Sequence, residues 1–419
     1  MRRLISIACA VVFLSSALAG QSKRLWVLRA PGEAVEYDPA TFAEKHTVKI
    51  PASALVSPQS FSINSLGQML FVPPATIPLA ESDLADEKRA WFWDEHTATM
   101  LGRDVTRSTS TVGSNLAIAE SASTPFLSSE GTHLYWFSNR ARRLQRDGVD
   151  LSTETTWLAW RTDLAGAART EVASITLPDC PCRTGSCEET CPYGETWIPD
   201  DGVGKFFLLT QFVAGQTQPT YKATAAYDEN ADKWTPTALD PPLRRVLDAG
   251  NAQEILEAVP DTGCCGWSNE SDDHTQLRFR GKALVMFDEL AEYQNPDYDV
   301  SFYTRNGKLS PGLGSVAFTI VATAQPNTAI QLAEQGQANP EESQRIRKAL
   351  LDLPAVELKS VEDPPRRLAF LPHAILVGWI SDKEILIVES HLLVAYNVTS
   401  AARRKSNIRV DDAEHVFLR

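Results

Sequence analysis

The stretch that most constrains the fold lies near the end of the chain, at residues 375–410, and contains four short strand patterns in series. The first three patterns are Ile375–Ile380, Ile385–Glu389 and Leu392–Val398, and Ser406–Val410 follows a polar, basic turn. Short apolar and β-branched runs separated by turn residues are typical of antiparallel strands that follow one another in sequence. The stretch therefore predicts one four-stranded meander.

A four-stranded meander of about 36 residues has the size of one blade of a β-propeller. One such sheet cannot bury both of its faces, so other sheets must pack against it around an axis. Turns in which an aromatic residue precedes Asp or Asn recur along the chain. They lie at Tyr37-Asp38, Trp93-Asp94, Tyr227-Asp228 and Tyr396-Asn397, with weaker forms at Trp160–Asp163 and Tyr303-Thr304. The sequence thus predicts an all-β fold, a single β-propeller over residues 20–419.

The strand patterns divide into six units, although a seventh blade around Val316–Thr323 and Val356–Lys359 stays an alternative. The first unit has only three strand patterns, at Leu25–Leu28, Ala34–Tyr37 and His46–Ile50. The apolar segment His415–Leu418 is left over after the last unit. We expect this segment to pair into the first blade and close the ring, which would remove exposed sheet edges.

The recurring units resemble exported β-propellers of the TolB-like and WD40-like kind. Residues Tyr227–Trp234 also look like the strand–turn–strand of kelch repeats, but the double glycine of those repeats is missing. The resemblance covers nearly all of residues 20–419 and implies a propeller fold. It implies no particular activity, because propellers carry many different functions.

Residues 1–19 have the pattern of a secretory signal peptide. Arg2 and Arg3 precede the apolar run Leu4–Leu14, and Ala17-Leu18-Ala19 fits a cleavage site. We expect cleavage near Ala19 and a periplasmic or extracellular location. Removal of the two arginines changes the formal net charge from −13 to −15. This negative charge argues against nucleic acid and anionic membranes as partners, and no second apolar run is long enough to predict a transmembrane segment.

A cysteine-rich loop is predicted at residues 178–200, where the strand patterns are interrupted. An even number of cysteines in an exported chain favours disulfides, and six cysteines allow 15 complete pairings. The candidates are Cys180, Cys182, Cys187, Cys191, Cys264 and Cys265. A metal cluster or a redox-active Cys264-Cys265 disulfide are the alternatives, but the spacings do not fit zinc sites, so we expect no metal and no cofactor. Both cysteine segments are expected in connections between neighbouring blades.

Two insertions are predicted to be helical. In residues 241–259, Asn251 and Glu254 resemble a capping box, with apolar residues following at helical spacing. In residues 328–353, Asn339-Pro340 followed by acids is typical of a helix start.

Two polar loops are candidate ligand sites, since a tryptophan can stack on a sugar and carboxylates can hold its hydroxyl groups or a metal. A solvated loop is the competing interpretation of each. The candidate residues are Trp197, Asp200 and Asp201 in one loop, and Trp267, Asp272, Asp273 and His274 in the other.

No common catalytic motif occurs: the sequence lacks G-x-S-x-G, H-E-x-x-H, a P-loop and a dinucleotide fingerprint. We therefore expect a non-enzymatic binding scaffold for a protein, a peptide or a glycan, which would bind on the face that carries the loops between blades. The alternative is an exported hydrolase or lyase that acts on a glycan. It would use acids of those loops, such as Asp200 with Asp201 or Asp272 with Asp273, because glycoside chemistry needs paired carboxylates.

Overall fold

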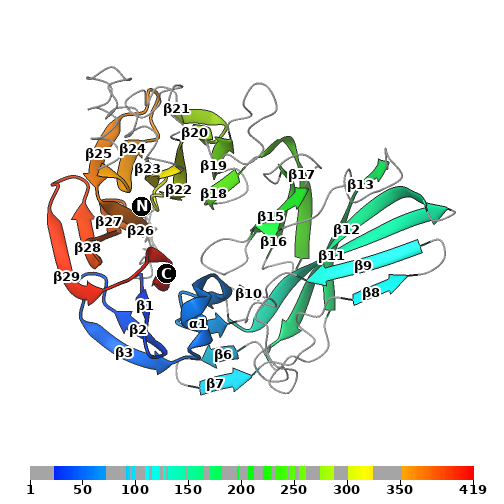
Figure 1. Cartoon of the computed structure of the whole chain (residues 1–419), viewed down its shortest axis with the longest axis horizontal. Helices are drawn as coiled ribbons and strands as arrows, with labels where there is room; N and C mark the ends of the chain where they lie inside the picture. Colours follow the sequence, from blue (N-terminus) through cyan, green and yellow to red (C-terminus); the bar gives the residue numbers. More distant parts are fainter. Residues whose placement is uncertain are drawn as a thin grey trace, which may run out of the picture.

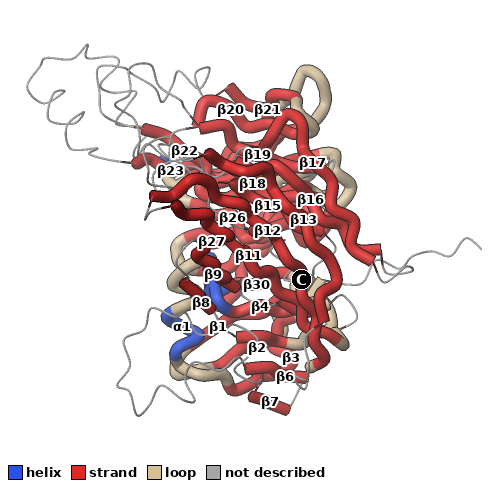
Figure 2. The backbone as a smooth tube through the Cα atoms, turned by 90° about the vertical axis from the view of Figure 1, so that its right-hand side faces the viewer, coloured by secondary structure: helices blue, strands red, loops and turns tan. Residues whose placement is uncertain are grey.

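The computed structural model describes residues 23–71, 91–94, 97–100, 109–112, 116–122, 126–128, 131–146, 149–164, 170–181, 196–197, 206–211, 220–228, 233–243, 245–250, 254–260, 274–286, 301–323 and 352–419. Within these residues the chain is almost entirely β-structure, in agreement with the predicted fold class. Every strand pairing is antiparallel, and the strands form seven sheets that follow one another around a common centre (Figure 1). Figure 2 shows the same array from the side, with very little helix. This arrangement is consistent with a propeller.

We number the sheets by the order in which their first strands occur. Sheet 1 contains β1 (Leu25–Arg29), β2 (Glu33–Tyr37), β3 (Glu44–Lys49) and β30 (Val416–Leu418). Sheet 2 contains β4 (Phe61–Ile63), β5 (Met69–Phe71), β6 (Trp91–Asp94) and β7 (Thr97–Met100). Sheet 3 contains β8 (Thr109–Val112), β9 (Leu116–Ala122), β10 (Phe126–Leu127), β11 (His133–Arg146), β12 (Val149–Asp163) and β13 (Thr170–Pro181).

The other four sheets have four strands each. Sheet 4 contains β14 (Thr196–Trp197), β15 (Phe206–Gln211), β16 (Thr220–Asp228) and β17 (Lys233–Leu243). Sheet 5 contains β18 (Arg245–Ala249), β19 (Ile255–Pro260), β20 (His274–Phe279) and β21 (Lys282–Met286). Sheet 6 contains β22 (Ser301–Leu309), β23 (Ser315–Thr323), β24 (Ala355–Ser360) and β25 (Arg367–Pro372). Sheet 7 contains β26 (Ala374–Ser381), β27 (Glu384–Glu389), β28 (Leu392–Asn397) and β29 (Arg403–Arg409).

The hydrophobic core lies between successive sheets. One cluster joins Leu256 and Phe279 of sheet 5 to Phe318 of sheet 6, and further clusters join sheets 6 and 7, 7 and 1, 1 and 2, and 2 and 3. Sheets 1, 2, 3, 5, 6 and 7 thus bury apolar residues against a neighbouring sheet, which is the packing that one isolated meander cannot achieve. The expected packing of sheets around an axis follows from these clusters.

The last strand of the chain pairs with the first, as the leftover segment predicted. Strand β30 lies beside β1 with Leu25 opposite Leu418 and Val27 opposite Val416. It completes sheet 1 as the fourth strand, in the order β3-β2-β1-β30.

The division into six units is corrected by the strand pairing. The segments proposed as an alternative extra unit are β23 and β24, and they form sheet 6 together with β22 and β25. The sequence concealed this sheet because β23 ends at residue 323 and β24 begins only at residue 355.

The helix expected in residues 241–259 is wrong, because this region contains β18 and most of β19, which pair with each other. The apolar residues Ile255 and Leu256 are buried in a strand, and Glu254 accepts a hydrogen bond from Arg280 (2.6 Å) rather than capping a helix. Similarly, the segment with Cys264 and Cys265 joins β19 to β20 within one sheet, not two neighbouring blades. The second predicted helix, residues 328–353, lies almost entirely outside the described residues.

Sheet 3 extends beyond the others (Figure 1). Its strands β11 and β12 have 14 and 15 residues. One end of β11 pairs with β10 and the other end pairs with β9. Across the described parts of the chain, no helix is long and apolar enough to cross a membrane.

Candidate functional site

Bulges mark the inner strands of three successive sheets, namely the first strands β18, β22 and β26. The unpaired residues are Leu247, Arg305 and Val377, respectively. A bulge turns a side chain away from the regular strand direction and is often found beside functional sites. Leu247 and Val377 pack against apolar clusters, whereas Arg305 is charged. Hydrophobic packing therefore explains the bulges at Leu247 and Val377 but not the bulge at Arg305.

The guanidinium of Arg305 reaches two carboxylates of the segment between β29 and β30. Its Nη2 donates to both oxygens of Asp412 (3.2 and 3.3 Å) and to Oε1 of Glu414 (3.1 Å). The side chains of Arg305, Asp412 and Glu414 are 34, 39 and 43% exposed, so all three are accessible to a solute. Partial burial by itself lowers the pKa of Arg305, but Asp412 and Glu414 outweigh it and raise that pKa above its ordinary value.

The backbone around Arg305 is fixed to sheet 7. Asn306 donates from Nδ2 to the carbonyl of Leu376 (2.8 Å), and the buried Trp379 donates from Nε1 to the carbonyl of Lys308 (2.9 Å). The carboxylate side is fixed as well, because Asp412 caps the short helix η3 (Ala413–His415) by accepting from the backbone N–H of Glu414 (3.2 Å). The arginine and both acids are thus held in place by their own elements.

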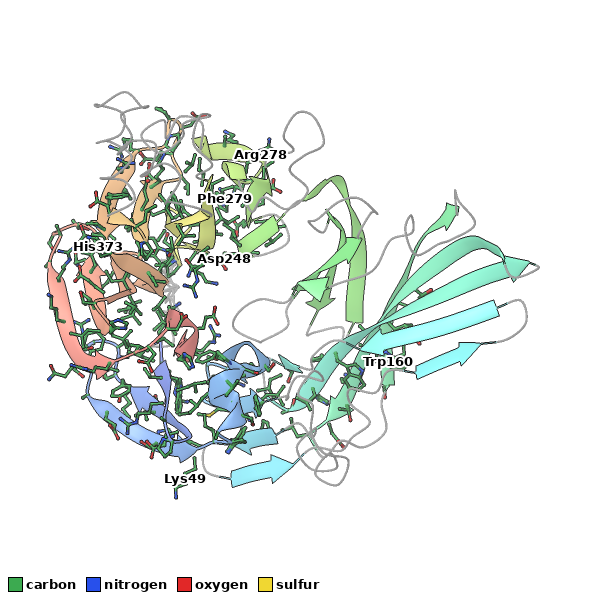
Figure 3. The ribbon with its side chains drawn as sticks, viewed as in Figure 1. Lys49, Trp160, Asp248, Arg278, Phe279 and His373 are labelled. Atoms are coloured by element: carbon green, nitrogen blue, oxygen red, sulfur yellow. The ribbon has the colours of Figure 1, made fainter. Side chains whose placement is uncertain are left out.

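A second charge pair lies one sheet further along the inner strands. Asp248 accepts from the N–H of Leu309 (2.8 Å), and its carboxylate lies 3.7 Å from Nζ of Lys308. In Figure 3, Asp248 lies beside the common centre of the sheets. We call Asp248, Arg305, Lys308, Asp412 and Glu414 the axial cluster.

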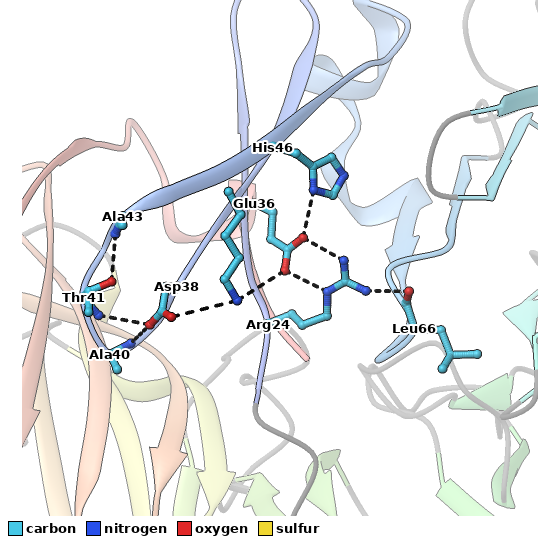
Figure 4. Close-up of polar contacts among 9 residues, drawn as sticks. Arg24, Glu36, Asp38, Ala40, Thr41, Ala43, His46 and Leu66 are labelled. Atoms are coloured by element: carbon cyan, nitrogen blue, oxygen red, sulfur yellow. Dashed lines mark hydrogen bonds and ion pairs between the residues drawn. The ribbon is translucent and has the colours of Figure 1, made fainter.

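A different charged group, around Glu36, is enclosed within sheet 1 (Figure 4). Glu36 accepts two hydrogen bonds from Arg24 (2.9 and 2.7 Å), and His46 and Lys45 lie 3.1 and 3.9 Å from it. Burial alone would raise the pKa of Glu36, but the cationic neighbours lower it below its ordinary value. Because Glu36 is only 3% exposed, this group supports the fold and offers no reactive oxygen to a substrate.

Sheet 6 repeats this buried arrangement at the same place in the strand order. Glu357 lies on β24, as Glu36 lies on β2, and is completely buried. Arg367 donates to both of its oxygens (2.9 and 3.2 Å), and Lys359 lies 3.8 Å away. A glutamate on the third strand with an arginine and a lysine around it is therefore a structural feature of two sheets.

The residues predicted from the sequence fall mostly outside the described part of the chain. Trp197 is in β14 opposite Leu208, His274 begins β20 opposite Pro260, and Cys180 is in β13 opposite Thr153. Outside the described residues lie Asp200, Asp201, Trp267, Asp272, Asp273, Cys182, Cys187, Cys191, Cys264 and Cys265. Their roles as ligand-binding residues or disulfide partners stay predictions.

Sequence reasoning missed Arg305, Asp412 and Glu414. The pattern at His415–Leu418 predicts only a closing strand and gives no role to the acids that precede it. The density of charged residues immediately before an apolar segment was the available signal. The partner arginine lies 107 residues earlier than Asp412, and no local pattern indicates that distance. In the described portion, no three His, Cys, Asp or Glu side chains gather to hold a metal ion.

No protein-family model and no curated protein matches this sequence. Among solved structures, dipeptidyl peptidase 4 from Porphyromonas gingivalis is similar at 10% identity and a TM-score of 0.42, covering 94% of this chain and 59% of that one. The chain thus spans about three-fifths of the peptidase. The periplasmic gluconolactonase of Pseudomonas aeruginosa is similar at 10% identity and a TM-score of 0.39, with 94% and 98% covered. A post-proline cleaving enzyme from Rickettsia typhi has 9% identity and a TM-score of 0.35, with 94% and 55% covered.

These findings go against the expectation of a non-enzymatic binding scaffold, which is corrected. The similar structures include peptidases, a lactonase and an apocarotenoid oxygenase, all of which are enzymes. At such identities and TM-scores the matches transfer no activity and no site residue to this chain.

Proposed function

We propose that the chain is a hydrolase acting on a glycan, with Asp412 and Glu414 as the two reacting carboxyl groups and Arg305 between them. The observation that carries the proposal is that both carboxylates approach the same nitrogen, Nη2 of Arg305. Their oxygens can therefore be no further apart than two hydrogen-bond lengths. This lies below the separation of roughly 6.5–9.5 Å that inverting glycosidases need for a water molecule, so a retaining mechanism is favoured.

The geometry suggests a division of work between the two acids. Asp412 holds Arg305 with both oxygens and also caps η3, so its position is fixed and suits the nucleophile. Glu414 is bound to Arg305 through Oε1, and in this proposal it is the acid that protonates the leaving oxygen. Arg305 would orient both and shield their mutual repulsion.

The remaining features of the fold and location are part of the same proposal. We infer that the seven sheets are blades of one ring, closed by the pairing of β30 with β1. The residue pattern of positions 1–19 supports export of the enzyme. Trp197, Asp200, Asp201, Trp267, Asp272, Asp273 and His274 are retained as candidates for contacts to the glycan.

The test is an activity screen of the chain from Gly20 onward against aryl glycosides and against neutral and acidic polysaccharides. Reducing ends released by hydrolysis are measured, and ultraviolet absorbance detects unsaturated ends. On the substrate that is turned over, Asp412→Asn and Glu414→Gln should each lower kcat by 10³-fold or more, on the order expected when a required carboxyl group is lost.

Asp411→Asn is the matched control, because Asp411 is an exposed acid directly beside the cluster. It should leave kcat within about twofold of the parent. Full turnover by the Asp412→Asn/Glu414→Gln double variant would overturn the assignment of the site. Loss of turnover in Asp272→Asn/Asp273→Asn alone would move the reaction to that loop.

A further inference from the structure

The outer strands of four successive sheets are unusually basic. Strands β21, β25, β29 and β3 belong to sheets 5, 6, 7 and 1, and together they carry eight Lys or Arg residues and a single acid, Glu44. The whole chain has the opposite balance, with 40 basic and 53 acidic residues. The outer strands β13 and β17 show no such excess: β13 has two acids and no cation, and β17 has one of each.

The charges concentrate at the outward positions of β29 and β3. On β29 the exposed residues alternate with covered ones and are Arg403, Lys405, Asn407 and Arg409. On β3 the corresponding residues are Lys45, Thr47 and Lys49. None is acidic, and alternate residues on a strand lie about 7 Å apart. Figure 3 shows Lys49 pointing away from the array. We call these seven residues the outer basic rim.

Three cations of the rim have no ion-pair partner among the residues that the structure describes. These are Lys49, Lys405 and Arg409, whereas Arg403 lies 3.6 Å from Glu389, and Lys45 lies 3.9 Å from Glu36. The two strands are also joined across the sheet boundary. Arg404 donates to the carbonyl of Pro39 (3.1 Å) and stacks over Phe42, both in the β2–β3 turn. The two strands of the rim are therefore held together near the start of β29, and the rim carries uncompensated positive charge.

We propose that the outer basic rim binds an acidic polysaccharide, a linear polymer with regularly spaced carboxylates. The rim lies on β29 and β3, two of the four basic strands that follow one another around the outside of the array (Figure 1). A flexible chain can follow this course, whereas a flat membrane can touch only part of it. The choice of a polysaccharide over a nucleic acid rests on the proposed function. The rim would hold the polymer at a distance from the axial cluster and retain it between cleavage events.

Positive charge on an outer strand has a simpler use, which is to prevent edge-to-edge aggregation. The two roles make different predictions. A guard against aggregation depends on charge of either sign at the edge. Polymer binding depends on positive charge and weakens as salt increases.

The experiment compares the parent with Lys49→Gln/Lys405→Gln/Arg409→Gln by titration calorimetry with polygalacturonate at several salt concentrations. The rim variant should bind about tenfold or more weakly and should show a shallower salt dependence. Arg280→Gln/Arg366→Gln/Lys383→Gln is the matched control, since it removes three exposed cations outside the rim. The control should bind like the parent.

Equal affinities of the rim and control variants would overturn the proposal, as would an absence of binding by the parent. A preference for phosphatidylglycerol vesicles or for single-stranded DNA over polygalacturonate would also overturn it. Aggregation of the rim variant without loss of affinity would assign the charges to edge protection alone. Binding is separable from catalysis, because Asp412→Asn/Glu414→Gln should keep the affinity, and the rim variant should still cleave a small aryl glycoside if the proposed function holds.

Discussion

Glu36 is the acid on which the acid stability of sheet 1 depends most directly. Its pKa is lowered in the folded chain, because Arg24, His46 and Lys45 favour the ionised form. A group of this kind stabilises the fold above its unfolded pKa, and the stabilisation is lost as pH falls through the lower, folded pKa. The affected range therefore lies below about pH 4.

Glu36→Gln should lower the free energy of unfolding at neutral pH by about 3 kcal/mol, because it leaves the partly buried Arg24 without its counter-charge. The difference from the parent should shrink as pH falls below about 4. Urea unfolding between pH 7 and pH 3 measures this. Glu33→Gln is the control: its pair with Arg29 is solvent-exposed, and its loss should be worth under about 1 kcal/mol at every pH. The same pH dependence in both variants would contradict this account of Glu36.

Gly131 is a residue whose role could be predicted only in part. The sequence indicates a turn at Ser129-Glu130-Gly131, and Gly131 indeed has a positive φ of 64°. A Cβ there would collide with Oε1 of Gln68, which lies in the turn between β4 and β5. No local pattern reveals this neighbour, because 63 residues separate the two.

Gly131→Ala should lower the stability by about 2 kcal/mol, through backbone strain and displacement of Gln68. Thermal unfolding followed by tryptophan fluorescence measures the shift. Gly314→Ala is the matched control, because a Cβ at Gly314 meets nothing within 4 Å, and it should unfold within about a degree of the parent. A Gly131→Ala variant that is as stable as the parent would show that the turn relaxes freely.

Strands with clear polar–apolar alternation or an apolar run could be predicted from the sequence. Strands whose formation depends on pairing with a distant strand could not. The first three strands of sheet 7 match the patterns in residues 375–398, whereas β29 begins at Arg403, three residues before the predicted strand and within the predicted basic turn. Strand β30 was expected from the incomplete first unit. The spacing of Asn251 and Glu254 predicts a helix cap in a region that contains β18 and β19. Strand β19 pairs with β20, which begins at His274, 14 residues after the end of β19 at Pro260. A local propensity does not reveal a partner at that distance in the sequence.

Strand β30 should contribute far more stability than its three residues suggest. Phe417 is 7% exposed and packs against Phe61, with ring centroids 5.8 Å apart. Phe417→Ala should therefore cost about 3–4 kcal/mol. Val56→Ala removes apolar atoms from a side chain that is 80% exposed, and it should cost almost nothing. Denaturant midpoints of the two variants test this, and equal midpoints would mean that sheet 1 is stable without β30.

For the complete chain, the fold class could be predicted and the axial cluster could not. The all-β class follows from strand-sized periodicity, which is local information. Arg305 and the acids at 412 and 414 meet only because sheets 6, 7 and 1 lie side by side, and the order of sheets in space is not encoded by any one segment. The polar segments 197–201 and 267–274 can be recognised in the sequence, because their composition is local.

The oxidation state of the cysteines is a further prediction for the complete chain. We expect all six cysteines that follow residue 19 to be paired, so the exported protein should take up an alkylating reagent only after reduction. Intact mass spectrometry with and without reductant measures the difference. Alkylation of unreduced protein at six positions would contradict the disulfide prediction.

The backbones of Arg24 and Arg419 exchange hydrogen bonds in both directions. Closing this contact in the unfolded chain requires two segments separated by almost the whole sequence to find each other, which is entropically unfavourable and slow. A short linker from residue 419 to residue 23 would turn the same contact into a local hairpin. A new opening could then be placed in the exposed turn at Asp382-Lys383. Such a circular permutant keeps every strand pairing, but sheet 7, not sheet 1, is then completed by strands from the two ends of the chain. A comparison of the refolding rates of the permutant and the parent would show how much the pairing of β1 with β30 slows folding.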